Sequence, residues 1–143
     1  MTWKRALGKR KEWYRTVDIG DGWKVRMSYW YTTYSPSDVC PDADVSLIAY
    51  RGPYLGRWTW RREGKASGPG GTRVASAALG LLREVEDEIR KSDWLSVHLY
   101  VTGATLRLYM AYRAVLKRRD YQETAEASNE YGPAMLKVLR PGP

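Results

Sequence analysis

The 143-residue sequence contains no phenylalanine, a single cysteine (Cys40) and a single histidine (His98). One cysteine cannot form an internal disulfide. Neither a CxxC pair nor a Cys/His ligand set is present, so the sequence excludes a structural zinc site and predicts no metal. A chain without disulfides is typical of a reducing compartment. We therefore expect a cytoplasmic protein, in the host cytoplasm if its source is a virus.

Long apolar segments are also missing. No run approaches the roughly 18 consecutive apolar residues that a membrane-spanning helix needs. The basic segment of residues 1–13 is not followed by the apolar core of a signal peptide. Hydrophobic residues nevertheless make up 43% of the chain, which is typical of a folded protein. The length suits one domain with a buried core, so we expect a single domain outside the membrane.

Basic and aromatic residues are abundant. The formal net charge is +8, and the aromatic residues are seven tryptophans and eleven tyrosines. A charge of this sign favours an anionic partner, which is a nucleic acid, a phosphate-bearing cofactor or an acidic protein. Tryptophan and tyrosine combine a large apolar area with a polar tip, and they suit half-buried sheets or surfaces that stack on planar ligands.

The first half of the chain has the patterns of antiparallel strands. Residues 14–34 alternate between apolar and polar positions around Gly20-Asp21-Gly22, which predicts a β-hairpin. Residues 44–50 and 54–61 also alternate and predict two further strands. Residues 1–13 carry five positive charges and predict a basic arm or a short helix.

The second half alternates helix and strand patterns. After a glycine-rich stretch at residues 62–71, apolar residues at helical spacing predict a helix over residues 72–91. A strand over 94–101, a helix over 104–119, a polar connection over 121–130 and a last strand over 131–139 follow. This order predicts one α+β domain over residues 14–143, with two main helices packed on a mixed, mainly antiparallel sheet.

One segment has the pattern of an anion site. A strand, a glycine-rich loop and a helix start follow one another between Arg61 and Arg73. Backbone N–H groups at a helix start are unpaired, the helix dipole is positive there, and glycines let the backbone approach a phosphate closely. The segment is not a Walker A motif, because no Gly-Lys-Ser/Thr follows the glycines.

The element order from about residue 44 to residue 139 resembles the GNAT superfamily of N-acetyltransferases. In that family a pyrophosphate-binding loop, Arg/Gln-x-x-Gly-x-Gly/Ala, opens a helix after antiparallel strands, and Arg73-Val-Ala-Ser-Ala-Ala78 fits its spacing. The segment Ala111-Tyr-Arg-Ala-Val-Leu-Lys-Arg-Arg-Asp-Tyr-Gln-Glu123 is similar to the family's later helix. The resemblance implies acetyl-CoA as the cofactor. The cofactor-binding residues that it implies are Arg73, Ser76, Ala78, Gly70 and Gly71.

The resemblance also implies a chemistry, the attack of an amine on a thioester. Such a site needs a base for the amine and an acid for the leaving thiolate. Glu63 is the first candidate base, His98 the second, and Tyr112 the candidate acid. Ser76 stands where the family usually has glycine, and Leu116 stands where it often has a tyrosine. The two functional alternatives within this resemblance are therefore an active N-acyltransferase and a catalytically degenerate relative.

Two other classes of function fit the sequence. Interleaved basic and aromatic residues favour a nucleic-acid-binding accessory protein, because cations neutralise phosphates and exposed rings stack on bases. The residues proposed for that role are Arg57, Trp58, Arg61, Arg62, Arg118 and Arg119. The small size and single domain also fit a viral structural or inhibitory interaction protein.

Overall fold

The computed structural model describes residues 3–8, 11–32, 39–56, 59, 71–103, 106–129 and 132–141. They form one seven-stranded sheet and two main helices, α2 (Gly71–Arg90) and α3 (Leu106–Arg118). The strands are β1 (Lys4–Arg5), β2 (Glu12–Gly20), β3 (Trp23–Thr32), β4 (Asp42–Arg51), β5 (Val97–Gly103), β6 (Gln122–Asn129) and β7 (Gly132–Leu139). The predicted fold class, α+β with a mixed and mainly antiparallel sheet, is confirmed.

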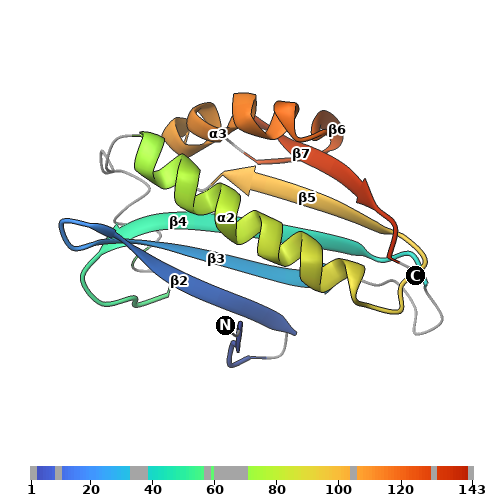
Figure 1. Cartoon of the computed structure of the whole chain (residues 1–143), viewed down its shortest axis with the longest axis horizontal. Helices are drawn as coiled ribbons and strands as arrows, with labels where there is room; N and C mark the ends of the chain where they lie inside the picture. Colours follow the sequence, from blue (N-terminus) through green and yellow to red (C-terminus); the bar gives the residue numbers. More distant parts are fainter. Residues whose placement is uncertain are drawn as a thin grey trace.

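Within the sheet the strand order is β1-β2-β3-β4-β5-β7-β6. Every neighbouring pair is antiparallel except β4 and β5, which are parallel. The helix α2 connects these two parallel strands and crosses the sheet between them (Figure 1). A parallel pair requires such a crossover, because its second strand must start again at the end where the first began.

The predicted β-hairpin is confirmed as β2 and β3. Gly20, Asp21 and Gly22 all have positive φ angles, of 96°, 56° and 78°, which glycine adopts without strain and aspartate tolerates in turns. Before the hairpin, Lys4 and Arg5 form the short strand β1 along β2, where the sequence suggested an arm or a short helix. The strand β1 therefore forms the edge of the sheet and covers part of the outer side of β2.

The expected strand over residues 54–61 is wrong for the residues that are described there. Residues 54–56 lie outside any strand and Thr59 is helical, while residues 57, 58, 60 and 61 lie outside the described residues. Gly52 and Gly56 have φ angles of +74° and +58°, which turn the chain away from an extended path. The N–H of Leu55 donates to the Thr59 hydroxyl at 2.7 Å, so it does not join a strand ladder.

The strand β6 was missed by the sequence analysis, which expected a polar connection over residues 121–130. It pairs with β7 alone and forms an edge of the sheet. Its sequence, QETAEASN, has two alanines as its only apolar residues and no large hydrophobic side chain. An edge strand has fewer neighbours to pack against, and polar residues there discourage pairing with other chains. Hydrophobic periodicity therefore gave no signal for it.

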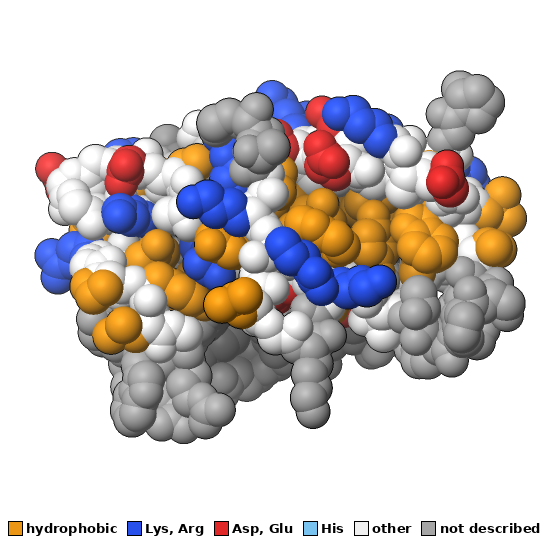
Figure 2. Space-filling view, turned by 90° about the horizontal axis from the view of Figure 1, so that it is seen from below, with side chains coloured by type: hydrophobic (Ala, Val, Ile, Leu, Met, Phe, Trp, Pro, Cys, Tyr) orange, Lys and Arg blue, Asp and Glu red, His pale blue; other side chains and the backbone are white. Residues whose placement is uncertain are grey.

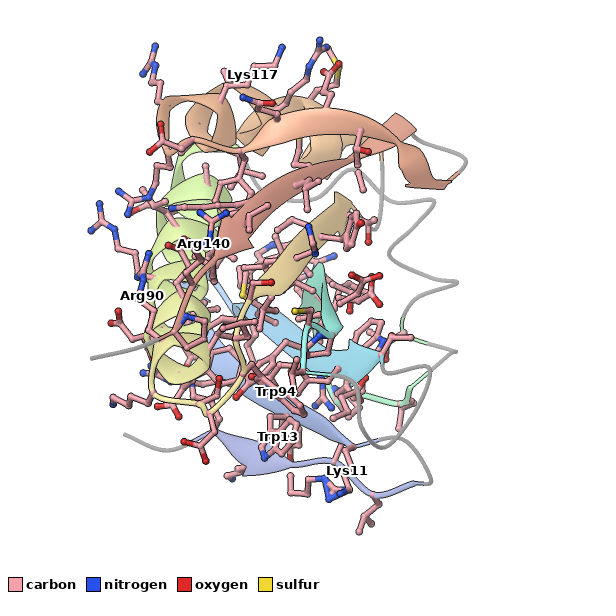
Figure 3. The ribbon with its side chains drawn as sticks, turned by 90° about the vertical axis from the view of Figure 1, so that its right-hand side faces the viewer. Lys11, Trp13, Arg90, Trp94, Lys117 and Arg140 are labelled. Carbon is pink, nitrogen blue, oxygen red and sulfur yellow. The ribbon has the colours of Figure 1, made fainter. Side chains whose placement is uncertain are left out.

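The main core lies between one face of the sheet and the two helices. Alternate residues of β3, β4 and β5, including Met27, Leu47 and Leu99, contact the apolar stripe of α2 and Leu116 of α3. Figure 3 shows the sheet from its end with α2 on one side of it. The opposite face, which we call the helix-free face, carries the intervening residues, among them Arg26, Asp42 and His98.

An ionic network is buried inside this core. The Glu86 carboxylate is 1% exposed, and it accepts hydrogen bonds from the Tyr121 hydroxyl at 2.9 Å and from Lys137 Nζ at 3.0 Å. Arg90 donates to the same carboxylate at 3.2 Å from the helix surface. The network links α2 to the segment after α3 and to β7. It satisfies a buried charge that would otherwise be costly.

Buried tyrosines make the fold sensitive to alkali. Burial raises the pKa of Tyr29, Tyr31 and Tyr121 above the ordinary value of 10, and the Glu86 carboxylate raises the pKa of Tyr121 further. As the pH rises, the unfolded chain loses its tyrosine hydroxyl protons before the folded chain does. The contribution of the three protonated tyrosines to the free energy of unfolding is therefore complete below pH 10. Above pH 10 it is lost, by up to about 1.4 kcal/mol per pH unit for each tyrosine. Urea unfolding between pH 9 and pH 11 measures this slope.

The variant Tyr121→Phe tests the assignment, because it keeps the ring and removes one of the three ionisable hydroxyls. We expect its free energy of unfolding to fall less steeply above pH 10 than that of the unmodified protein. Equal slopes for the two proteins would show that Tyr121 ionises as readily in the folded state as in the unfolded chain.

Candidate functional site

The parallel strands β4 and β5 part at one end of the sheet. Their ladder runs from Asp42 opposite His98 to Leu47 opposite Gly103, where β5 ends. The strand β4 continues to Arg51 and stays paired with β3 alone. Residues 48–51 of β4 therefore have no β5 partner, and no other described strand pairs with them on that side.

Both main helices begin at this same end. The helix α2 starts beside the carboxyl ends of β4 and β5 (Figure 1), and α3 starts three residues after β5 ends. Helix starts carry unpaired N–H groups and a partial positive charge. Ligands of sheets with parallel strands bind preferentially at the carboxyl ends of those strands. The parting of β4 and β5 is therefore the candidate functional site.

An apolar cavity of about 20 Å³ lies beneath this site. It is bordered by Leu47 of β4, Val101 of β5, Ala78 of α2 and Leu116 of α3. A cavity of this size holds one water-sized group. Small alanines in α2 leave this space between the helices, so Ala78, predicted to bind a cofactor, packs inward and is 6% exposed.

Arg73 and Ser76 lie together in the first turns of α2, on the side of the helix that faces β2 and not the cavity. With Ile19 and Ala77 they border an open groove between α2 and the end of β2. Arg73 Nη1 donates to the Ile19 carbonyl oxygen at 3.0 Å and to Asp21 Oδ2 at 3.2 Å, which anchors it to the hairpin turn. The guanidinium is half exposed, and the structure brings these two predicted cofactor-binding residues to one surface. Gly71 is the first residue of α2, and Gly70 lies outside the described residues.

Of the three candidate catalytic residues, only the His98 side chain is described, and it lies away from the parting. His98 lies near the start of β5, five residues before Gly103, which is about 16 Å along an extended strand. Its Nδ1 lies 3.7 Å from Asp42 Oδ1 on the helix-free face. Tyr112 belongs to α3, and its side chain and all of Glu63 lie outside what is described.

Two of the residues proposed for nucleic acid are described. Arg118 is exposed at the end of α3, whereas the Arg119 Nε atom is buried without a hydrogen-bond partner. Arg57, Trp58, Arg61 and Arg62 lie outside the described residues. The predicted nucleic-acid-binding set therefore stays a prediction.

A cluster on the helix-free face was not predicted. The Arg26 guanidinium carbon lies 3.8 Å from the centre of the Tyr14 ring and 3.9 Å from the centre of the Tyr54 ring. Tyr54 also contacts Tyr50 of β4, with ring centres 5.4 Å apart. Alternation places Arg26 on the polar face of its strand. However, no sequence spacing connects Tyr14, Arg26 and Tyr54, which come from β2, β3 and the segment after β4.

Within the described ranges, no group of three or more His, Cys, Asp or Glu side chains is placed to hold a metal ion. Neither helix that the structure describes is long and apolar enough to cross a membrane.

Comparison with protein-family models, with curated proteins and with solved structures gives no match to this chain.

Proposed function

We propose that this protein is a GNAT-like, acyl-CoA-dependent N-acyltransferase or a catalytically degenerate relative, acting in the cytoplasm. The observation that carries the proposal is the parting of the parallel strands β4 and β5 beside the start of α2. In the resemblance derived from the sequence, the pyrophosphate loop opens this same helix. The order of antiparallel strands, helix, strand, helix and closing strands also supports the proposal.

The described residues suit an anionic cofactor with a long tail. Arg73 and Ser76 offer a cation and a hydroxyl at the groove beside α2, and the first turn of the helix offers backbone N–H groups. Neighbouring Ala75 and Ala77 have small side chains, which allow a ligand to approach the helix closely. These residues would hold the pyrophosphate of acetyl-CoA.

Bound acetyl-CoA would supply an acetyl thioester, and its transfer to an amine forms a C–N bond, breaks the C–S bond and moves one proton from nitrogen to sulfur. The chain must provide a base for that proton and an acid for the thiolate. Glu63 and Tyr112 remain the proposed base and acid. His98 is less suited, because it lies at the other end of β5.

The proposal is tested by thermal unfolding with acetyl-CoA. At ten times the dissociation constant a ligand stabilises by about 1.4 kcal/mol, which raises the Tm of a protein of this size by about 4 °C. We expect this rise for the unmodified protein and a smaller one for Arg73→Ala. Arg83→Ala removes an exposed arginine later on the same helix and should leave the rise unchanged.

A second ligand makes the thermal experiment specific. Acetylated pantetheine carries the same thioester but lacks the pyrophosphate, so we expect it to cause little or no rise in Tm. The absence of any rise with millimolar acetyl-CoA would contradict the proposal. An equal rise in Arg73→Ala would remove Arg73 from the cofactor site.

Nucleic acid is the second candidate ligand, and one surface favours it. Lys and Arg side chains lie among hydrophobic ones along the face that Figure 2 shows. At one end of the molecule, cationic side chains lie above, beside and below two tryptophans (Figure 3); the labelled residues are Lys11, Trp13, Arg90, Trp94, Lys117 and Arg140. Binding of a single-stranded oligonucleotide that weakens steeply with salt would support this function, and binding that ignores salt would contradict it.

A further inference from the structure

Arg26 is held by aromatic rings from two directions. It belongs to β3, while Tyr14 comes from the neighbouring strand β2 on one side and Tyr54 from the segment after β4 on the other. Both ring centres lie within 4 Å of the guanidinium carbon. At these distances the flat faces of the guanidinium contact the rings, so only its edge remains available for hydrogen bonds.

This guanidinium has no anionic partner among the described residues. Its Nε atom is buried and makes no hydrogen bond, and no described carboxylate lies within ion-pair distance. The residues opposite Arg26 in the ladders are Thr16 and Ile48, neither of which is acidic. Buried donors in folded proteins are nearly always satisfied, so the Arg26 Nε donor requires a partner that the described residues do not supply.

The position of Arg26 relates it to the candidate site. Its ladder partner Ile48 is the first residue of β4 beyond the last pair with β5. Neighbouring strands lie about 4.8 Å apart, so Arg26 is within about two strand spacings of the parting. It lies on the helix-free face, whereas α2 and its groove lie on the other face. Arg26 therefore lies on the side of the sheet opposite the proposed cofactor groove.

We propose that Arg26, clamped between Tyr14 and Tyr54, binds the carboxylate of an acyl acceptor, which makes that acceptor an amino acid or a peptide end. The inference rests on the proposed acyltransferase function. A carboxylate is planar and pairs with the guanidinium edge through two parallel hydrogen bonds in one plane. That plane fits between two rings, whereas a tetrahedral phosphate would direct oxygens toward the ring faces. An amino group near the bound carboxylate then lies close to the parting.

The experiment compares matched acceptors that differ in one group. Each of the twenty amino acids and, in a separate reaction, its carboxamide is incubated with the protein and acetyl-CoA. The release of free thiol is measured in each reaction. We expect turnover to favour the acid over the amide by about tenfold or more in kcat/KM, because a charge-assisted pair is lost in the amide. In Arg26→Met the ratio should fall to about one. Arg26→Lys keeps the charge but lacks the planar guanidinium, so its acid-to-amide ratio should lie between those of the unmodified protein and Arg26→Met.

Thermal unfolding without acetyl-CoA provides a readout that does not need catalysis. The preferred acid should raise the Tm of the unmodified protein more than its amide does, and this difference should vanish in Arg26→Met. Arg5→Met is the matched control, since Arg5 in β1 is a cation over the Trp13 ring at 5.5 Å, away from the parting. Its preference for the acid should remain that of the unmodified protein.

The two proposals fail in different ways. No rise in Tm with acetyl-CoA, together with stabilisation by acids that depends on Arg26, overturns the acyltransferase and keeps the carboxylate site. Equal turnover of acid and amide, or an acid preference that persists in Arg26→Met, overturns the carboxylate site and keeps the acyltransferase. If none of the twenty acids stabilises the protein beyond its amide and none is turned over in preference to it, the carboxylate site is also overturned.

Discussion

Replacing Glu86 with alanine is expected to lower the free energy of unfolding by about 3–5 kcal/mol, because it removes one partner of a buried ionic network. The Lys137 ammonium, whose side chain is 16% exposed, loses the carboxylate oxygen that lies 3.0 Å away. The Tyr121 hydroxyl loses its acceptor at the same time. Arg90 can turn into the solvent, since its side chain is 47% exposed, so most of the cost arises at Lys137 and Tyr121.

Urea unfolding followed by far-ultraviolet circular dichroism measures this loss. Glu88→Ala is the matched control, because Glu88 is an exposed acid on the same helix whose contact with Lys91 spans 3.8 Å. An exposed pair of this kind contributes about 0–1 kcal/mol. The double variant Glu86→Leu, Lys137→Met should recover much of the loss by removing both charges. A Glu86→Ala protein as stable as Glu88→Ala would show that the network contributes nothing.

Replacing Tyr29 with alanine should cost about 3–5 kcal/mol, the range for truncating a large buried aromatic side chain. Tyr29 is 5% exposed and stands at the centre of an aromatic cluster. Its ring centre lies 5.2 Å from that of Trp3, 5.5 Å from that of Trp13 and 6.3 Å from that of Tyr31. The cluster continues from Tyr31 to Trp94 before β5. Truncation would therefore loosen the contacts of β3 with Trp3 and with Trp13 of β2 at once.

The control for this variant is Tyr29→Phe, which keeps the ring and its contacts. We expect it to change stability by less than about 1 kcal/mol, since only the hydroxyl is lost. Tryptophan fluorescence should report a changed environment in Tyr29→Ala, because Trp3 and Trp13 lie against the ring. A large loss in the phenylalanine variant would mean that the hydroxyl, and not ring packing, holds the cluster.

Strong local periodicity made most of the elements predictable. The helix expected over residues 72–91 is Gly71–Arg90, and the helix expected over 104–119 is Leu106–Arg118. The hairpin was found from the alternation around Gly20-Asp21-Gly22, because turn chemistry and strand period act over a few residues. The segment 54–61 has the same alternation, but the left-handed backbone of Gly52 before it and of Gly56 within it overrode the pattern.

The candidate site was only partly accessible to sequence reasoning. The start of α2 could be predicted, because glycines before a helical pattern mark such a junction, and Arg73 and Ser76 do share a groove there. The approach of Tyr14 and Tyr54 to Arg26 could not, since it depends on strand neighbours that the sequence order does not specify. The partnership of Glu86 with Tyr121 and Lys137 was missed for the same reason, as these residues lie 35 and 51 positions away.

The sequence by itself determined the α+β class, the two main helices, most of the strands and the excess of positive charge, because composition and periodicity act locally. The tertiary structure decided which strands became neighbours. Among the described residues, it placed the one parallel pair where α2 begins and buried Glu86 among cationic and hydroxyl partners. It also placed Arg26 between two tyrosines, with no described carboxylate beside it. Contacts between distant segments are selected by the packing of the whole chain, so a pattern of a few residues cannot specify them.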